Sequence, residues 1–317
     1  MGDLYLVTGG AGFIGSHVVA ELLERGHEVR ILDNFSTGRR GNLAAIDGQI
    51  DVVEGDMRSY ERAHNAVKGA DYVIHLAALP SVPRSVQDPL TTNEANITGT
   101  LNVLLAARDN GVRRAVLASS SSVYGSNEAM PKREDLVPQP ISPYAVSKLA
   151  AEQYARAFAT VYGLETVSLR YFNVFGPRQD PTSQYSGVVP RFMRLAIEGG
   201  SPVVFGDGEQ SRDFTYVANV VDATLSAATA VSAAGRFCNI GCGDPKTVLD
   251  LIAAVGRVAG RRLEPEFVAP RPGDVKHSFA DIELARSLLG YEPRVGFDEG
   301  IELTFAWLAH DMASARA

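Results

Sequence analysis

The sequence has little cysteine, a single tryptophan and no long apolar run. Two cysteines among 317 residues cannot form a disulfide framework, so the reducing cytoplasm is the expected compartment. No apolar run is long enough to span a bilayer, and Met1-Gly2-Asp3 leads directly into a strand-like segment, so we expect neither a signal peptide nor a membrane anchor. Acidic residues outnumber basic ones by 37 to 30, which disfavours nucleic-acid binding.

Metal chemistry is not indicated by the residues that bind metals. The six histidines are scattered along the chain without ligand spacing. Cys238 and Cys242 have a spacing found in some metal sites, but no further ligand cluster accompanies them. We interpret both as thiols of the protein core and expect no metal site.

The first half of the chain alternates short β-branched segments with longer amphipathic ones. Such alternation predicts an α/β fold with a doubly wound parallel sheet covered on both faces. Gly26 has the position of a residue that ends a helix. The expected strands are Leu4–Val7, Val29–Leu32, Asp51–Glu54, Tyr72–Leu76, Ala115–Ala118 and Thr166–Arg170, and the expected helices are Phe13–Arg25, Asn96–Arg108 and Tyr144–Tyr162.

After Tyr171 the segments become shorter and richer in glycine and proline. Two helices are still legible there. Thr247 and Asp250 form a capping-box pattern at the start of a helix over Val248–Val258, and Asp281 can cap another that ends at Leu289. We therefore expect a second, smaller C-terminal region over the carboxyl edge of the sheet.

A glycine-rich motif, Thr8-Gly9-Gly10-Ala11-Gly12-Phe13-Ile14-Gly15, joins the first strand to the first helix. Its glycines allow a tight turn and let a pyrophosphate approach the N–H groups of the helix N-terminus. Asp33 ends the second strand, where a carboxylate holds the adenosine ribose of a dinucleotide. The pattern predicts a Rossmann-type fold and NAD rather than NADP, although the nearby Arg39 and Arg40 could favour a 2′-phosphate.

A tyrosine and a lysine lie four residues apart in the expected helix over Tyr144–Tyr162. This spacing places Tyr144 and Lys148 on one face, where a cation favours the phenolate form and lets the tyrosine remove a proton. Hydroxyl side chains, Ser119 to Ser122, follow the fifth expected strand, at the sheet edge that binds ligands. An amphipathic helix and a serine-rich turn without chemistry are the alternative interpretation.

Together these motifs resemble the extended short-chain dehydrogenase/reductase family and, within it, the nucleotide-sugar 4-epimerases, over essentially the whole chain. The resemblance implies an NAD-binding Rossmann domain at 1–172, completed by about 214–241, and a UDP-sugar-binding region at 173–213 and 242–317. It implies tightly bound NAD, held by Gly9, Gly12, Phe13, Ile14, Asp33, Asn34, Phe35, Ser36, Gly38, Asp56, Met57, Leu76, Ala77, Ala78, Asn96, Tyr144, Lys148 and Tyr171.

The resemblance also implies a reaction. Tyr144, Lys148, Ser120 and Ser121 are the implied catalytic residues of a 4-epimerisation of UDP-hexoses through a transient 4-keto sugar. Arg212 and Arg271 would bind the diphosphate, and Phe205 would lie against uracil. The implied substrate residues are Ser81, Ser122, Asn173, Val189, Phe205, Arg212, Arg271, Asp274 and Ser278.

The family has several branches, and residues of this chain bear on them. Ser121 and Ser122 stand where the dehydratases carry an acidic pair, and Asp180 would repel a uronate, so a neutral hexose is favoured. The small Ser278 implies that N-acetylated sugars are accepted. UDP-glucuronate epimerisation, a dehydratase, a reductase and a non-catalytic dinucleotide-binding protein remain alternatives. The resemblance also implies a homodimer formed by the helices at Asn96–Arg108 and Tyr144–Tyr162.

Overall fold

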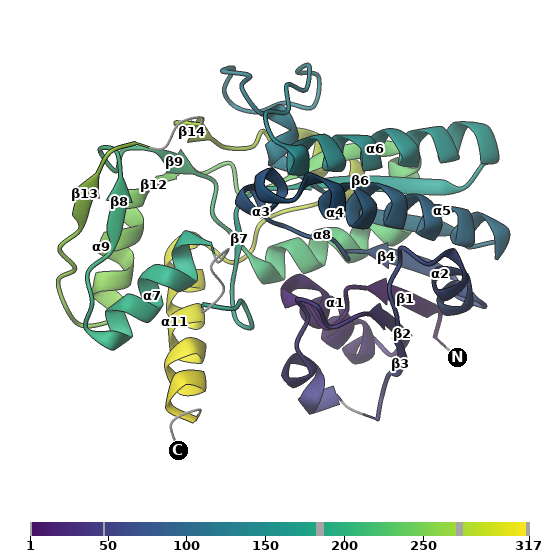
Figure 1. The fold of residues 1–317 in the computed structure, drawn as a ribbon, viewed down its shortest axis with the longest axis horizontal. Helices are drawn as coiled ribbons and strands as arrows, with labels where there is room; N and C mark the ends of the chain where they lie inside the picture. Colours follow the sequence, from purple (N-terminus) through teal and green to yellow (C-terminus); the bar gives the residue numbers. More distant parts are fainter. Residues whose placement is uncertain (1, 47, 182–186, 271–274, 315–317) are drawn as a thin grey trace.

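The computed structural model describes residues 2–46, 48–181, 187–270 and 275–314. Seven parallel strands form the central sheet, in the order β3-β2-β1-β4-β5-β6-β11 (Figure 1). The Rossmann-type doubly wound sheet predicted from the sequence is thereby confirmed. The strands are β1 (Leu4–Thr8), β2 (Glu28–Asp33), β3 (Asp51–Glu54), β4 (Tyr72–His75), β5 (Arg114–Ser120), β6 (Glu165–Tyr171) and β11 (Arg236–Ile240).

Helices cover both faces of this sheet. Helices α2 (Tyr60–Val67), α5 (Gly99–Asp109) and α6 (Pro143–Tyr162) pack on one face, and α1 (Phe13–Glu24) and α8 (Val217–Thr229) on the other (Figure 1). Ser142 caps the start of helix α6, since its hydroxyl accepts a hydrogen bond from the N–H of Ala145 at 3.2 Å, and Gly163, in the left-handed conformation, caps its end. The two faces bury separate apolar clusters, so the strands are apolar on both sides.

The segment before α5 differs from the expected single helix over Asn96–Arg108. The chain is already helical in α3 (Val82–Gln87) and α4 (Pro89–Asn93), and a π-helical turn over Glu94–Thr98 leads into α5. Proline begins α4 at its first position, and the Asp88 carboxylate accepts from the N–H of Thr91 at 3.0 Å. The helical start was missed because this cap lies ahead of the apolar periodicity.

The C-terminal half adds a second layer of helices and short strands, on the left in Figure 1. The capping box predicted at Thr247 and Asp250 is present, and Gly290 ends α10 in the left-handed conformation. The helices of this layer are α7 (Val188–Glu198), α9 (Val248–Val258) and α11 (Phe297–Ser314), whereas α10 (Glu283–Leu289) packs against β11 and α8 at the edge of the main sheet. The paired strands are β7 (Val174–Phe175) with β10 (Thr215–Tyr216), β8 (Val203–Phe205) with β13 (Glu266–Val268), and β9 (Ser211–Arg212) with β12 (Lys246–Thr247) and β14 (His277–Ser278).

None of the helices within the described ranges is both long and apolar enough to cross a membrane.

Candidate active site

A cavity of about 1790 Å³ lies at the carboxyl ends of the central strands. Strand β1 has β2 on one side and β4 on the other, so the connections diverge there and leave a crevice. Residues at the ends of five neighbouring strands line it: Gly9, Asp33, Leu76, Ser120 and Tyr171. Pockets for one drug-sized ligand measure about 300–1,000 Å³, so this cavity has room for two such molecules side by side.

The glycine motif forms one wall of the cavity, and its glycines place only backbone atoms there. Gly9 has a φ of +71°, and a Cβ atom there would lie 2.8 Å from the amide nitrogen of Ala77. A Cβ on Gly15 would meet the carbonyl oxygen of Gly9. Helix α1 begins at Phe13 immediately behind this turn, so its free N–H groups face a surface that a phosphate can approach closely.

Asp33 ends β2 and is 7% exposed. Its carboxylate accepts hydrogen bonds from the N–H groups of Ala11 at 2.9 Å and Phe35 at 2.8 Å. Burial raises the pKa of Asp33 although these two donors oppose the shift. The side chain is therefore fixed and presents an acceptor at the edge of the cavity, as the ribose of a dinucleotide requires.

The two arginines that could have favoured a 2′-phosphate are both paired with carboxylates. Arg39 forms an ion pair with Asp180. Arg40 pairs with Glu54 at 2.5 Å, and its guanidinium lies over the Phe35 ring at 4.0 Å. Because Arg39 and Arg40 are engaged in this way, the geometry agrees with the preference for NAD inferred from Asp33.

Tyr144 and Lys148 lie in the first two turns of α6 and both line the cavity. The Lys148 ammonium donates to the carbonyl oxygen of Ala118 at 2.9 Å and lies 5.9 Å from the centre of the Tyr144 ring. Burial lowers the pKa of Lys148 to about 8, with the charge of Glu152 opposing the shift. Burial raises the pKa of Tyr144, with a hydrogen bond to Ser120 opposing it.

The raised pKa of Tyr144 differs from the phenolate expected from the Tyr-Lys spacing. In the protein alone, desolvation of the phenol outweighs the hydrogen bond with Ser120. A positive charge bound in the cavity would act in the opposite direction and favour the phenolate.

The serines after β5 have separate environments. Ser120 accepts a hydrogen bond from the N–H of Ser122 at 3.1 Å, which caps the turn Ser121–Tyr124. Ser119 donates instead to the buried Glu152. The Ser122 hydroxyl oxygen is buried in the wall of the cavity and has no hydrogen-bond partner among the described residues. A buried polar atom of this kind marks a position where a ligand can supply the missing partner.

Most residues predicted from the sequence come together around this one cavity. Those that line it are Gly9, Gly12, Phe13, Ile14, Asp33, Asn34, Ser36, Gly38, Asp56, Met57, Leu76, Ala77, Ala78, Ser81, Ser120, Ser121, Ser122, Tyr144, Lys148, Tyr171, Asn173, Arg212 and Ser278. Arg271 and Asp274 lie outside the described residues.

Four predicted residues are absent from the lining of the described cavity: Phe35, Asn96, Val189 and Phe205. The Asn96 amide oxygen accepts from the N–H of Leu79 at 2.8 Å and its nitrogen donates to Ser147 at 3.0 Å, so Asn96 fixes the loop after β4. Val189 packs within the core, and Phe35 lies beneath Arg40. Direct ligand contacts by these residues stay predictions.

The cavity also contains residues that the sequence analysis did not select. Arg84, Lys132 and Gln179 line it, and the Gln179 amide oxygen is buried without a partner among the described residues. Gln179 follows Gly176-Pro177-Arg178 directly, and the position of that motif after β7 was the available signal.

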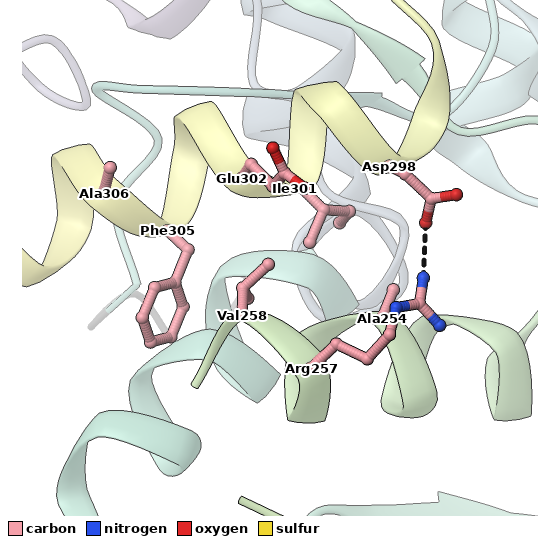
Figure 2. A pocket seen from close by; sticks show the side chains of 8 residues that line it. All are labelled: Ala254, Arg257, Val258, Asp298, Ile301, Glu302, Phe305 and Ala306. Carbon is pink, nitrogen blue, oxygen red and sulfur yellow. Dashed lines mark hydrogen bonds and ion pairs between the residues drawn. The ribbon is translucent and has the colours of Figure 1, made fainter. Parts of the chain in front are cut away.

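A second, smaller cavity of about 580 Å³ lies between α9 and α11 (Figure 2). Apolar side chains such as Val258 and Phe305 line it, and at its edge Arg257 pairs with Asp298 at 2.6 Å. Both partners of this ion pair are mostly exposed, so the opening has the chemistry of a solvated helix surface.

Comparison with known proteins agrees with this geometry. A model of the NAD dependent epimerase/dehydratase family matches residues 5–241, about three quarters of the chain. The chain belongs to this family. The UDP-glucose 4-epimerase of Mycolicibacterium smegmatis is 39% identical over 307 residues, covering 94% of this chain and 96% of the relative.

Solved structures of epimerase/dehydratase family members have the same fold. The UDP-N-acetylglucosamine 4-epimerase of Methanobrevibacter ruminantium, in complex with UDP-N-acetylmuramic acid, has a TM-score of 0.94 at 39% identity, covering 98% of this chain and 100% of that one. The UDP-glucuronic acid 4-epimerase of Bacillus cereus, in complex with UDP-glucuronic acid and NAD, has a TM-score of 0.90 at 32% identity. The match covers 97% of this chain and 99% of that one.

The residues present fit NAD, the cofactor named in the description of the NAD dependent epimerase/dehydratase family. The turn at Gly9 leaves a cradle that a Cβ atom would fill, and Asp33 offers a fixed carboxylate beside it. Within the described part of the chain, histidine, cysteine and carboxylate side chains form no group of three that could hold a metal ion.

Proposed function

We propose that this member of the family is an NAD-dependent 4-epimerase of UDP-hexoses, acting on UDP-glucose and UDP-galactose and on their 2-N-acetylated forms. The observation that carries the proposal is the convergence of Ser120, Tyr144 and Lys148 on a cavity with room for a dinucleotide and a nucleotide sugar. The relatives named as UDP-sugar 4-epimerases support it.

The cofactor half of the cavity has residues for each part of NAD. Gly9 and Gly12, with the N-terminus of α1, would hold the pyrophosphate, Asp33 the adenosine ribose and Lys148 the nicotinamide ribose. Bound NAD supplies an acceptor that takes a hydride from the sugar and returns it within one turnover. Lys148 then serves orientation and charge rather than proton transfer.

Tyr144 is the proposed proton-transfer residue. As a phenolate it would take the proton of the sugar 4-hydroxyl, and as a phenol it would return a proton to the same oxygen when the epimeric hydroxyl forms. Ser120, which shares a hydrogen bond with Tyr144, would orient the same sugar hydroxyl, with Ser121 as its neighbour in the turn. This division of roles requires no other general base in the cavity.

The other half of the cavity would clamp UDP and hold the sugar loosely. The Arg212 guanidinium is positioned by the carbonyl oxygens of Ser211 at 2.9 Å and Lys276 at 3.1 Å, and it lines the cavity. A fixed arginine suits a diphosphate. Asn173 would contribute to the same clamp. The hexose must turn over between hydride transfers, so we expect few strong bonds to its ring.

UDP-glucuronate epimerisation is the second candidate. Asp180 disfavours this activity, because its carboxylate would repel a uronate. The ion pair of Asp180 with Arg39 offsets part of that negative charge, and the relative from Bacillus cereus is named as a UDP-glucuronic acid 4-epimerase. Ser121 and Ser122 still disfavour a dehydratase, because neither hydroxyl replaces a carboxyl acid or base.

The test is incubation of the purified protein with UDP-glucose, UDP-N-acetylglucosamine and UDP-glucuronate separately, without added NAD, followed by NMR. Inversion at carbon 4 of the first two sugars is the expected result. Conversion of the uronate alone would establish the second candidate instead. Net oxidation or reduction of the products, or a requirement for added NAD(P)H, would show a dehydrogenase or reductase.

Ser278 offers a prediction about the sugar. It lines the cavity and is paired in register with Arg212 through β14 and β9. We expect Ser278→Tyr to lower kcat/KM for UDP-N-acetylglucosamine relative to UDP-glucose by about 10- to 200-fold, because the ring would fill the space of the acetyl group. The UDP-glucose rate in the same variant is the internal control. An unchanged ratio of kcat/KM between the two UDP-sugars would show that Ser278 does not determine which sugar is accepted.

The homodimer also stays a proposal, and exposed apolar side chains of α6, one of the two predicted interface helices, support it. Val146 is 49% exposed and Val161 is 68% exposed, as an unpaired face of an interface helix would be. We expect sedimentation equilibrium to give twice the 33.9 kDa chain mass. A monomer at micromolar concentration would contradict this.

A further inference from the structure

Three side chains form a row on α6, of which the proposed mechanism uses two. Tyr144, Lys148 and Glu152 are spaced by four residues, so they lie one above another on the same helix face. Glu152 is 1% exposed, and it is deeper in the sheet interface than Lys148. A buried carboxylate is retained only where its charge is compensated.

The compensation comes from two neighbouring strands. Arg170 on β6 donates to the Glu152 carboxylate twice, from Nε at 2.9 Å and from a terminal nitrogen at 2.8 Å. Ser119 on β5 donates its hydroxyl to the same carboxylate. Ser119 and Arg170 are register partners in the sheet, so Glu152 ties α6 to both strands at one level.

These contacts of Glu152 are adjacent, along β5 and α6, to the proposed catalytic residues Ser120 and Lys148. Ser119 precedes Ser120, and the preceding residue, Ala118, accepts the Lys148 ammonium at 2.9 Å. Two successive residues of β5 are thus bonded to two successive turns of α6. The Arg170 guanidinium is held in turn over the rings of Tyr124 at 4.9 Å and Phe237 at 4.3 Å.

We propose that Glu152, fixed by Arg170 and Ser119, is a positioning residue that sets the distance and orientation of Lys148 and Ser120 relative to Tyr144. The expected effect of Glu152 on turnover rests on the proposed epimerase function. The expected effect of Glu152 on the titration of Lys148 does not depend on that function.

The charge of Glu152 also acts on Lys148. The titratable groups that interact with Lys148 are Tyr144 and Glu152 from its own helix and His75 from β4, with Arg170 from β6 acting through its pair with Glu152. Burial lowers the pKa of His75 to about 3, so it is neutral and adds no charge. Glu152 alone opposes the fall in the pKa of Lys148. Without this carboxylate, Lys148 loses its proton at a lower pH.

The main test is the double variant Glu152→Gln with Arg170→Met, which removes both buried charges together and so avoids an unpaired ion. The matched control is Glu165→Gln with Arg114→Met. That pair joins β5 to β6 at the amino ends of these strands, with 2.6 Å between its charged atoms. Titration of Lys148 is followed by NMR of ¹³Cε-labelled lysine, assigned with Lys148→Met.

In the double variant we expect the Lys148 midpoint and the alkaline limb of the kcat profile to move to lower pH, because Glu152 acts on Lys148 directly and Arg170 acts through Glu152. KM for the UDP-sugar should stay within about twofold, and the control should match the wild type in both respects. An unchanged Lys148 midpoint would overturn the proposal. If the wild type epimerises no UDP-sugar, the proposed function is wrong. The titration of Lys148 still tests the proposal about Glu152 in that case.

Ser119→Ala keeps both charges and provides a test if the double variant fails to fold. We expect its kcat to fall by about two- to tenfold, the effect of one hydrogen bond, with the Lys148 midpoint unchanged. A kcat equal to that of the wild type in Ser119→Ala would contradict the positioning role.

Discussion

Replacement of Tyr144 by phenylalanine is expected to lower kcat for UDP-sugar epimerisation by about 10²- to 10⁴-fold, the range for losing a general acid–base residue. The ring that packs at the start of α6 is kept, and only the hydroxyl that bonds to Ser120 is removed. Affinity for UDP should change little, because Arg212 and not Tyr144 is placed to bind the diphosphate. Turnover by NMR and UDP binding by calorimetry measure the two effects separately.

Tyr162→Phe is the matched control, since Tyr162 ends the same helix and is 51% exposed. Its hydroxyl is remote from the cavity lining, so kcat should equal that of the wild type. Full activity of Tyr144→Phe would show that another group removes the proton. Loss of UDP binding in that variant would instead indicate a disturbed cavity.

Replacement of Gly9 by alanine is expected to abolish retention of the dinucleotide, with at least about a 100-fold loss in NAD affinity. The new methyl group would lie 2.8 Å from the Ala77 nitrogen, and the residue has a positive φ. The turn after β1 must therefore shift, and the phosphate cradle shifts with it. Absorbance of NAD released from the denatured protein measures occupancy, independently of activity.

Gly69→Ala isolates the effect of the cradle from that of backbone strain. Gly69 has a φ of +77°, close to that of Gly9, but a Cβ atom there would meet nothing within 4 Å. We expect a loss of about 1 kcal/mol in the free energy of unfolding and normal NAD content. Equal NAD loss in both variants would mean that the Gly9 effect is one of stability alone.

The sequence predicted the fold because the determining signals are local. Apolar segments of strand length alternate with helical periodicity, and the glycine turn and Asp33 follow adjacent strands in the chain. Parallel strands then bring these strand ends to one edge, so the residues of the site converge without any knowledge of side-chain packing.

The parts that sequence analysis missed depend on contacts between distant segments. Glu152 and Arg170 look like ordinary helix and strand residues until β5 and β6 are known to be neighbours. The pairing of Arg39 with Asp180 joins residues on different regions of the chain. The hydrogen bonds of Asn96 with Leu79 and Ser147 also join different segments, and the cofactor contact that the resemblance implies for Asn96 stays a prediction.

The position of β11 has a consequence for synthesis on the ribosome. This strand, Arg236–Ile240, completes the main sheet beside β6 only after the chain has passed through α7, β8, β9 and α8. A nascent chain released as far as residue 172 would leave the edge of β6 with unpaired N–H and C=O groups. At about 5–20 residues per second, this edge stays open for several seconds. During the interval between the emergence of β6 and of β11, the growing polypeptide is therefore exposed to misassociation at this edge.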